Sequence, residues 1–132
     1  MLALLPALVI ALTVILLFVT SYAVGRARGL YKIKAPAMTG HPIFERAWRV
    51  QMNTLEATLM FLPSLWLAAH FSSAALAGFV GLVWVAARSW YGVAYIRNPS
   101  LRGLPFMIGS LCMAILLASG LIGLIQGMWA VL

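Results

Sequence analysis

The sequence predicts an all-α protein, an integral membrane bundle of four helices. Hydrophobic residues make up 64% of its 132 residues and charged residues only 8%, whereas a soluble domain usually carries about 25% charged residues. Four long apolar stretches alternate with short polar connections, and a membrane-spanning helix needs about 20 apolar residues. Strands of a membrane barrel would alternate polar and apolar residues over about ten positions, and these stretches do not.

The first predicted helix covers residues 3–28. It lacks a basic segment before its apolar run, and the run is longer than the core of a signal peptide, so we expect a retained membrane helix. The second predicted helix covers residues 43–71. It follows a polar connection over residues 29–42, in which Pro36 and a glycine interrupt regular structure.

The third predicted helix, residues 74–97, is separated from the second by a two-serine turn. A turn over residues 98–100 ends it, because Pro99 cannot extend the preceding hydrogen-bond ladder. The fourth predicted helix covers residues 101–129. We expect the four helices to form one domain over residues 1–132.

All nine basic residues fall near two of the three connections. They are Arg26, Arg28, Lys32, Lys34, Arg46 and Arg49 near the first, and Arg88, Arg97 and Arg102 near the third. Because basic loops favour the cytoplasmic side, we expect the loops over residues 29–42 and 98–100 in the cytoplasm and both termini on the opposite side. Nucleic-acid binding is disfavoured, because these residues do not lie on a soluble face.

Other features of the sequence restrict the function only weakly. The single cysteine, Cys112, cannot form an internal disulfide and so does not indicate a compartment. The sequence has no metal-ligand cluster, phosphate-binding glycine loop or Ser/His/Asp set, so we expect no metal. Gly123 and Gly127 have the spacing of close-packed membrane helices, which permits self-association without requiring it.

A polar stripe runs along the second predicted helix. It consists of Arg46, Arg49, Asn53 and Glu56. Spacings of three, four and three residues place them within a sector roughly 80° wide, at about 100° per residue. Snorkelling to the membrane interface would explain the two arginines, but not why the stripe continues inward to Asn53 and Glu56.

The third predicted helix carries a second polar stripe. It consists of Arg88, Tyr91 and Tyr95, and Arg97 and Arg102 flank the next turn. Opposite the first stripe, these residues favour a polar pocket that opens to the cytoplasmic face. Several arginines favour carboxylates or phosphates, and Glu56 suits an ammonium group. Glutathione has this chemistry, with two carboxylates, one amine and one thiol.

Two segments of the chain resemble the MAPEG family, the membrane-associated proteins of eicosanoid and glutathione metabolism. Residues 44–56, FERAWRVQMNTLE, resemble the FERxxRxQxNxxE signature of the family. Residues 87–95, ARSWYGVAY, with Arg97, Arg102 and Pro105, are similar to the family's third helix and the start of its fourth. The four-helix layout of the family covers the whole chain.

The resemblance implies a homotrimer of four-helix subunits that holds glutathione between neighbouring subunits, near the cytosolic face. It implies that the positions that bind glutathione are Arg28, Arg49, Gln51, Asn53, Glu56, Tyr91 and Tyr95, with Arg88 in a supporting position. Arg102 matches the arginine that lies next to the glutathione sulfur in the leukotriene synthase branch. One departure is Ala57, where that branch has a tyrosine, so one hydroxyl for glutathione is missing.

Arg102 is the candidate catalytic residue, because a nearby cation stabilises a thiolate. A free thiol has a pKa near 8.5, so only a few per cent is ionised at neutral pH. A cation about 4 Å away, at an effective dielectric constant near 20, favours the anion by up to about 4 kcal/mol, and half of that lowers the thiol pKa by more than one unit. The alternative is a loop arginine that only sets topology.

We therefore expect a membrane glutathione transferase that conjugates hydrophobic electrophiles, with reduction of lipid peroxides as a further activity, in a bacterial inner membrane. Its expected partners are glutathione, the electrophile or a lipid, membrane lipids and further copies of itself. One alternative is a non-catalytic lipid-binding or scaffold member of the family, against which Arg49, Glu56 and Arg102 argue. Another is a four-helix multidrug exporter, which would need an acid that the first predicted helix lacks. The sequence does not identify the electrophile.

Overall fold

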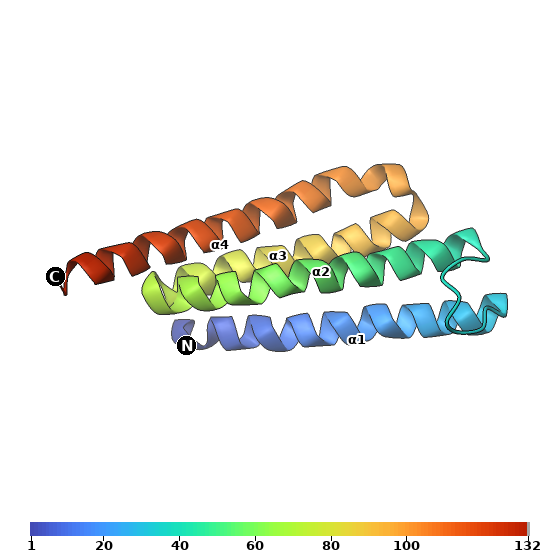
Figure 1. The fold of residues 1–132 in the computed structure, drawn as a ribbon, viewed down its shortest axis with the longest axis horizontal. Helices are drawn as coiled ribbons and strands as arrows, with labels where there is room; N and C mark the ends of the chain where they lie inside the picture. Colours follow the sequence, from blue (N-terminus) through green and yellow to red (C-terminus); the bar gives the residue numbers. More distant parts are fainter. Residues whose placement is uncertain (132) are drawn as a thin grey trace.

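The computed structural model describes residues 1–131 as a bundle of four long helices (Figure 1). The helices are α1 (Leu5–Tyr31), α2 (Pro42–Phe71), α3 (Ala74–Arg97) and α4 (Gly103–Trp129), with short 3-10 helices η1 (Leu2–Leu4) and η2 (Pro99–Arg102). The described residues contain no strand. The predicted all-α, four-helix fold is confirmed.

Four of the observed helix ends differ from the predicted ends: both ends of α1, the start of α2 and the start of α4. Helix α1 continues past the predicted end at residue 28, because the chain first leaves the helix at Lys32, which adopts a left-handed conformation with φ 55°. Helix α4 begins later than predicted, because η2 forms a separate turn ahead of it. The side chain of Asn98 caps that turn, since its Oδ1 accepts a hydrogen bond from the backbone N–H of Ser100 at 3.1 Å.

Local contacts fix the start of α2, and this sets the direction of its polar stripe. The Nδ1 atom of His41 accepts a hydrogen bond from the backbone N–H of Ile43 at 3.2 Å. The imidazole also stacks on Tyr31 at the end of α1, with 3.6 Å between ring centroids. Pro42 occupies the first helical position, where its missing N–H leaves no hydrogen bond unmade.

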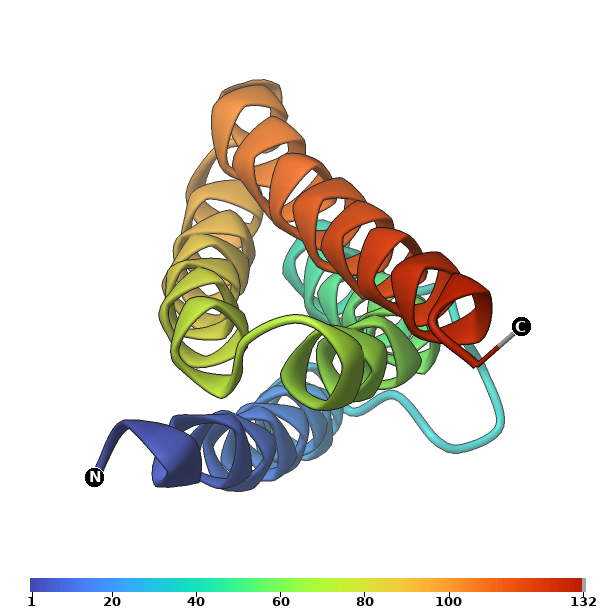
Figure 2. The ribbon, with the colours of Figure 1, turned by 90° about the vertical axis from the view of Figure 1, so that its left-hand side faces the viewer.

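Three described segments are long and apolar enough to cross a membrane: Leu2–Tyr31, Ala74–Arg97 and Pro99–Trp129. Helix α2 is as long as the others but is more polar, because it carries the stripe of arginines and Glu56. Both basic connections lie at one end of the bundle, and both termini lie at the other end (Figure 1). Figure 2 shows that α2 and α3 lie between α1 and α4.

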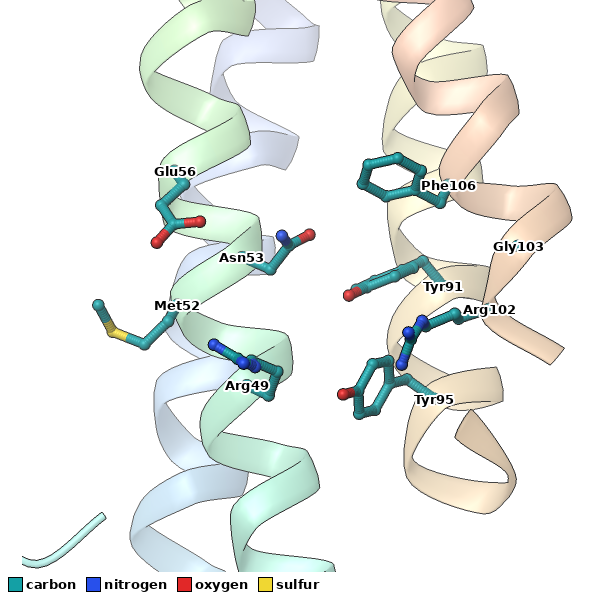
Figure 3. Close-up of a pocket in the computed structure, with 9 residues that line it drawn as sticks. All are labelled: Arg49, Met52, Asn53, Glu56, Tyr91, Tyr95, Arg102, Gly103 and Phe106. Carbon is teal, nitrogen blue, oxygen red and sulfur yellow. The ribbon is translucent and has the colours of Figure 1, made fainter. Parts of the chain in front are cut away.

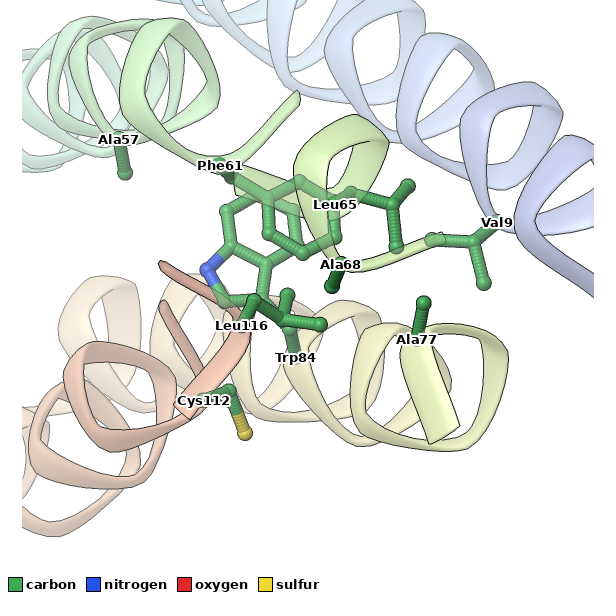
Figure 4. Close-up of a cluster of buried hydrophobic side chains, with 9 residues drawn as sticks. All are labelled: Val9, Ala57, Phe61, Leu65, Ala68, Ala77, Trp84, Cys112 and Leu116. Atoms are coloured by element: carbon green, nitrogen blue, oxygen red, sulfur yellow. The ribbon is translucent and has the colours of Figure 1, made fainter. Parts of the chain in front are cut away.

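A smaller apolar cluster around Phe44 joins α1 to α2 near the basic connections. The larger apolar cluster lies in the half of the bundle nearer the termini. Its largest member, Trp84, stacks on Phe61 with 3.7 Å between ring centroids (Figure 4). Helix α4 packs closely there, because a Cβ built on Gly123 would collide with the carbonyl oxygen of Phe71. Nothing lies within 4 Å of such an atom on Gly127. Gly123 therefore serves packing within the chain, and only Gly127 of the predicted pair is open to contacts outside it.

Candidate functional site

A cleft of about 400 Å³ lies between α2 on one side and α3 with the start of α4 on the other (Figure 3). It occupies the half of the bundle that holds the basic connections. We call it the main cleft, and its lining residues are Arg49, Met52, Asn53, Glu56, Tyr91, Tyr95, Arg102, Gly103 and Phe106. Both predicted polar stripes therefore face one space.

Helical spacing explains how the side chains reach the main cleft. Tyr91 and Tyr95 are four residues apart and share one face of α3. Figure 3 shows both phenol hydroxyls directed across the cleft toward α2, with the amide of Asn53 directed toward α3. The guanidinium carbon of Arg102 lies 5.1 Å from the centroid of the Tyr95 ring. This cation–π contact orients the Arg102 charge beside the cleft.

Arg88 lies behind the main cleft and connects its two walls. Its side chain is only 3% exposed. Its Nη2 atom donates hydrogen bonds to Asn53 Oδ1 at 2.9 Å and to Thr54 Oγ1 at 3.1 Å. Its guanidinium carbon lies 4.2 Å from the centroid of the Tyr91 ring. One buried cation therefore positions a residue on each side of the cleft and adds positive potential, which favours an anionic ligand.

Arg46 does not line the main cleft, although the stripe places it in the predicted pocket. Its Nη1 atom donates to the carbonyl oxygen of Ile96 at 3.1 Å, and the carbonyl of Arg97 lies 3.5 Å away. These carbonyls close α3, and a cation at a helix C-terminus is stabilised by the helix dipole. Arg46 instead lines an adjoining cavity together with Arg49 and Tyr95, and its guanidinium links α2 to the end of α3.

Arg28 and Gln51 lie on a different face of the chain, between α1 and α2. The Nη1 atom of Arg28 donates to the carbonyl oxygen of Ala37 at 2.7 Å. The Nε2 atom of Gln51 donates to Ser21 Oγ at 2.8 Å. Neither residue lines the main cleft of its own chain. A single chain thus brings together only part of the predicted glutathione set.

Comparison with known proteins identifies the family. The chain matches the model of the MAPEG family over residues 6–122. The chain belongs to the MAPEG family. Human microsomal glutathione S-transferase 2 is 35% identical to it over 101 residues, which cover 76% of this chain and 69% of the relative. Leukotriene C4 synthase of Cavia porcellus is 36% identical over 105 residues, which cover 80% of this chain and 70% of the relative. The uncharacterised protein sll1147 of Synechocystis is 41% identical over 120 residues, which cover 91% of this chain and 88% of the relative.

Three residues that line the main cleft of this MAPEG protein were not predicted from its sequence: Met52, Gly103 and Phe106. Two of them follow the spacing of predicted site residues. Met52 lies three residues after Arg49, and Phe106 lies four residues after Arg102, so helical periodicity places each pair on one face. Extending the polar stripes to their apolar neighbours would have found them.

Proposed function

We propose that this MAPEG protein is a glutathione transferase that joins the sulfur of glutathione to hydrophobic electrophiles. The observation that supports this most directly is the main cleft, which gathers Arg49 and Arg102 with Glu56 and two tyrosines. Arginines pair with carboxylates through parallel hydrogen bonds, and Glu56 suits the ammonium group. Similarity to microsomal glutathione S-transferase 2 and leukotriene C4 synthase supports the same class of activity.

In this proposal Arg102 is the catalytic residue. Its guanidinium lowers the pKa of the bound thiol, and the thiol proton leaves to solvent. The thiolate sulfur then forms a bond to the electrophilic carbon, and the leaving group departs with its electron pair. Such a cation accelerates the reaction because it stabilises the anion that attacks, in a cleft partly shielded from water.

We also propose that a neighbouring copy completes the site. Arg28 and Gln51 lie on the α1–α2 face, away from the main cleft of their own chain. If that face covers the cleft of a second copy, all the predicted residues surround one ligand. A homotrimer with this arrangement is the assembly we propose, with the main cleft open to the cytoplasm and the helices in a bacterial inner membrane.

The decisive experiment uses the full chain purified in detergent. We expect conjugation of glutathione with a chlorinated nitrobenzene, and glutathione binding by calorimetry in the micromolar to millimolar range. A lipid hydroperoxide offered in the same assay tests the further reductase activity. Inactivity with several electrophiles, together with no binding of glutathione, would refute the transferase proposal. Binding of lipid without glutathione would instead support a scaffold protein.

A further inference from the structure

A second, smaller cavity of about 160 Å³ adjoins the main cleft, deeper in the bundle. It shares Asn53, Glu56 and Phe106 with the main cleft and continues inward to Trp84 and Gly109. One water occupies about 30 Å³ of liquid, so this cavity has room for a functional group of a ligand. We call it the annex. Its position places it next to any molecule bound in the main cleft.

Two buried N–H groups at the annex have no hydrogen-bond acceptor among the described residues. They are the Nε1–H of Trp84 and the Nε–H of Arg88. Trp84 is 0% exposed and Arg88 is 3% exposed, and both residues line the annex. A buried donor without an acceptor is unfavourable, and native structures contain few of them. Two beside one cavity therefore point to a ligand with an acceptor.

Packing holds both side chains at the same wall of the annex. A Cβ built on Gly109 of α4 would lie 3.9 Å from Trp84 Nε1 and 3.6 Å from Arg88 Cδ. Stacking on Phe61, with 5° between the ring planes, holds the indole in one orientation. Figure 4 shows the indole nitrogen on the ring edge that lies on the side of Ala57, which is itself part of the annex wall.

We propose that the annex binds the carbonyl oxygen of the electrophilic substrate and that Trp84 and Arg88 donate to it. This inference rests on the proposed transferase function and names its substrate class: apolar α,β-unsaturated carbonyl compounds. Met60, Phe106 and Met113 supply apolar surface around the same cavity. Along α4, Gly109 lies about 9 Å from Gly103, the residue that follows Arg102, at about 1.5 Å per residue. A thiolate held by Arg102, the conjugated carbonyl that it attacks and the hydrogen bond to the carbonyl oxygen together span a comparable distance.

The reaction step follows from this placement. The thiolate sulfur in the main cleft forms a bond to the β-carbon of the substrate. The carbon–carbon π electrons shift so that negative charge develops on the carbonyl oxygen, giving an enolate. The two N–H groups in the annex stabilise that charge, and a proton from water then adds to the α-carbon. One donor of this kind typically contributes about 10²- to 10³-fold in kcat.

The first test compares two electrophiles in wild type and in Trp84→Phe, which keeps an aromatic ring against Phe61 but removes the N–H. The substrates are an apolar enone and benzyl chloride, which has no oxygen. We expect kcat/KM for the enone to fall by about tenfold or more, and that for benzyl chloride to change by less than about twofold. The KM for glutathione should stay unchanged. Trp66→Phe removes an indole that is 52% exposed and lies outside the annex, so kcat/KM should stay unchanged for both substrates.

A second variant guards against a packing defect in Trp84→Phe. Gly109→Ala adds a Cβ at ordinary packing distances of 3.6 to 3.9 Å and partly fills the annex. Calorimetry then measures binding of the saturated ketone, which has the oxygen but does not react, against the hydrocarbon of equal length. We expect wild type to prefer the ketone and both variants to lose that preference.

Equal losses for the enone and benzyl chloride, or an unchanged enone rate in both variants, would overturn the annex proposal. Wild type that prefers the ketone in a Trp84-dependent way but conjugates nothing would support the annex and refute the transferase function. Wild type that conjugates benzyl chloride but shows no preference for the ketone would support the transferase function and refute the annex proposal. The two failures are therefore distinguishable.

Discussion

The two ends of the bundle differ in how closely α2 and α4 approach each other. At the end with the termini, glycines bring helices into close contact: a Cβ on Gly120 would lie 2.8 Å from the backbone nitrogen of Ala68, and one on Gly81 would lie 2.8 Å from Val9. At the end with the basic connections, arginine and tyrosine side chains line the main cleft between α2 and the α3–α4 pair (Figure 3). Close packing at one end thus fixes the helices that form the cleft at the other.

The border between the two ends lies at Trp84 and Arg88, one helical turn apart on α3. Trp84 belongs to the apolar core, and Arg88 connects the walls of the main cleft. The annex lies at this border. Since close packing meets the two cavities there, we expect substitutions on the packed side to change stability and substitutions on the cleft side to change catalysis.

The largest effect should come from Arg102→Gln at the cleft end. We expect kcat to fall by about 100-fold, because the thiolate loses its cation. Removing a cation raises the pKa of the bound thiol toward its ordinary value near 8.5, so the loss should shrink as pH rises past that value. Conjugation rates from pH 6 to pH 10 measure this shift. Arg97→Gln removes the same charge from an exposed arginine outside the main cleft and should leave the profile in place. Equal falls in both variants would contradict the role of Arg102.

The next largest effect should come from Gly123→Ala at the close-packed end. The added Cβ collides with the carbonyl oxygen of Phe71, a backbone atom that cannot turn aside. We expect the free energy of unfolding to fall by about 1–3 kcal/mol, measured as a lower Tm in detergent. Gly127→Ala meets nothing within 4 Å and should keep or raise the Tm, because alanine favours helix more than glycine does. Similar losses in both variants would show that the contact with Phe71 is unimportant.

The same comparison explains which features were predictable from sequence. The two ends of α3, which match the prediction, depend on local turn signals, and the stripe of Arg49, Asn53 and Glu56 depends on the helical period. Both kinds of signal come from residues close together in the sequence. The contacts of the Arg46 and Gln51 side chains depend instead on which helix lies beside α2. Arg46 reaches the carbonyls that end α3, and Gln51 reaches Ser21 on α1. Helical periodicity assigns a residue to a face but does not say what that face meets, so these contacts were not predictable.

A smaller effect should come from Thr54→Val at the border. The Thr54 hydroxyl accepts from Arg88 Nη2, and valine has nearly the same shape without that acceptor. We expect a loss of about 1 kcal/mol in stability, together with a raised KM for glutathione, because Arg88 also positions Asn53. Thr58→Val is the matched control, since the hydroxyl of Thr58 donates only to the carbonyl of Thr54 in its own helix. If both variants raise the KM equally, the Arg88 link does not shape the cleft.

The smallest effect should come from Glu56→Gln. With Glu45→Gln as its control, it separates a direct contact of Glu56 with the ligand from the general effect of losing one negative charge. Glu56 and Glu45 are the only two acids in the chain. Glu56 lines the main cleft, whereas Glu45 accepts a hydrogen bond from the backbone N–H of Gly40. An exposed ion pair contributes up to about 1 kcal/mol, so Glu56→Gln should raise the KM for glutathione by about threefold to fivefold, and Glu45→Gln should not. A glutathione analogue without the amine should bind both variants like wild type. If that analogue also loses affinity for Glu56→Gln, the carboxylate acts on the shape of the cleft and does not pair with the ligand's ammonium group.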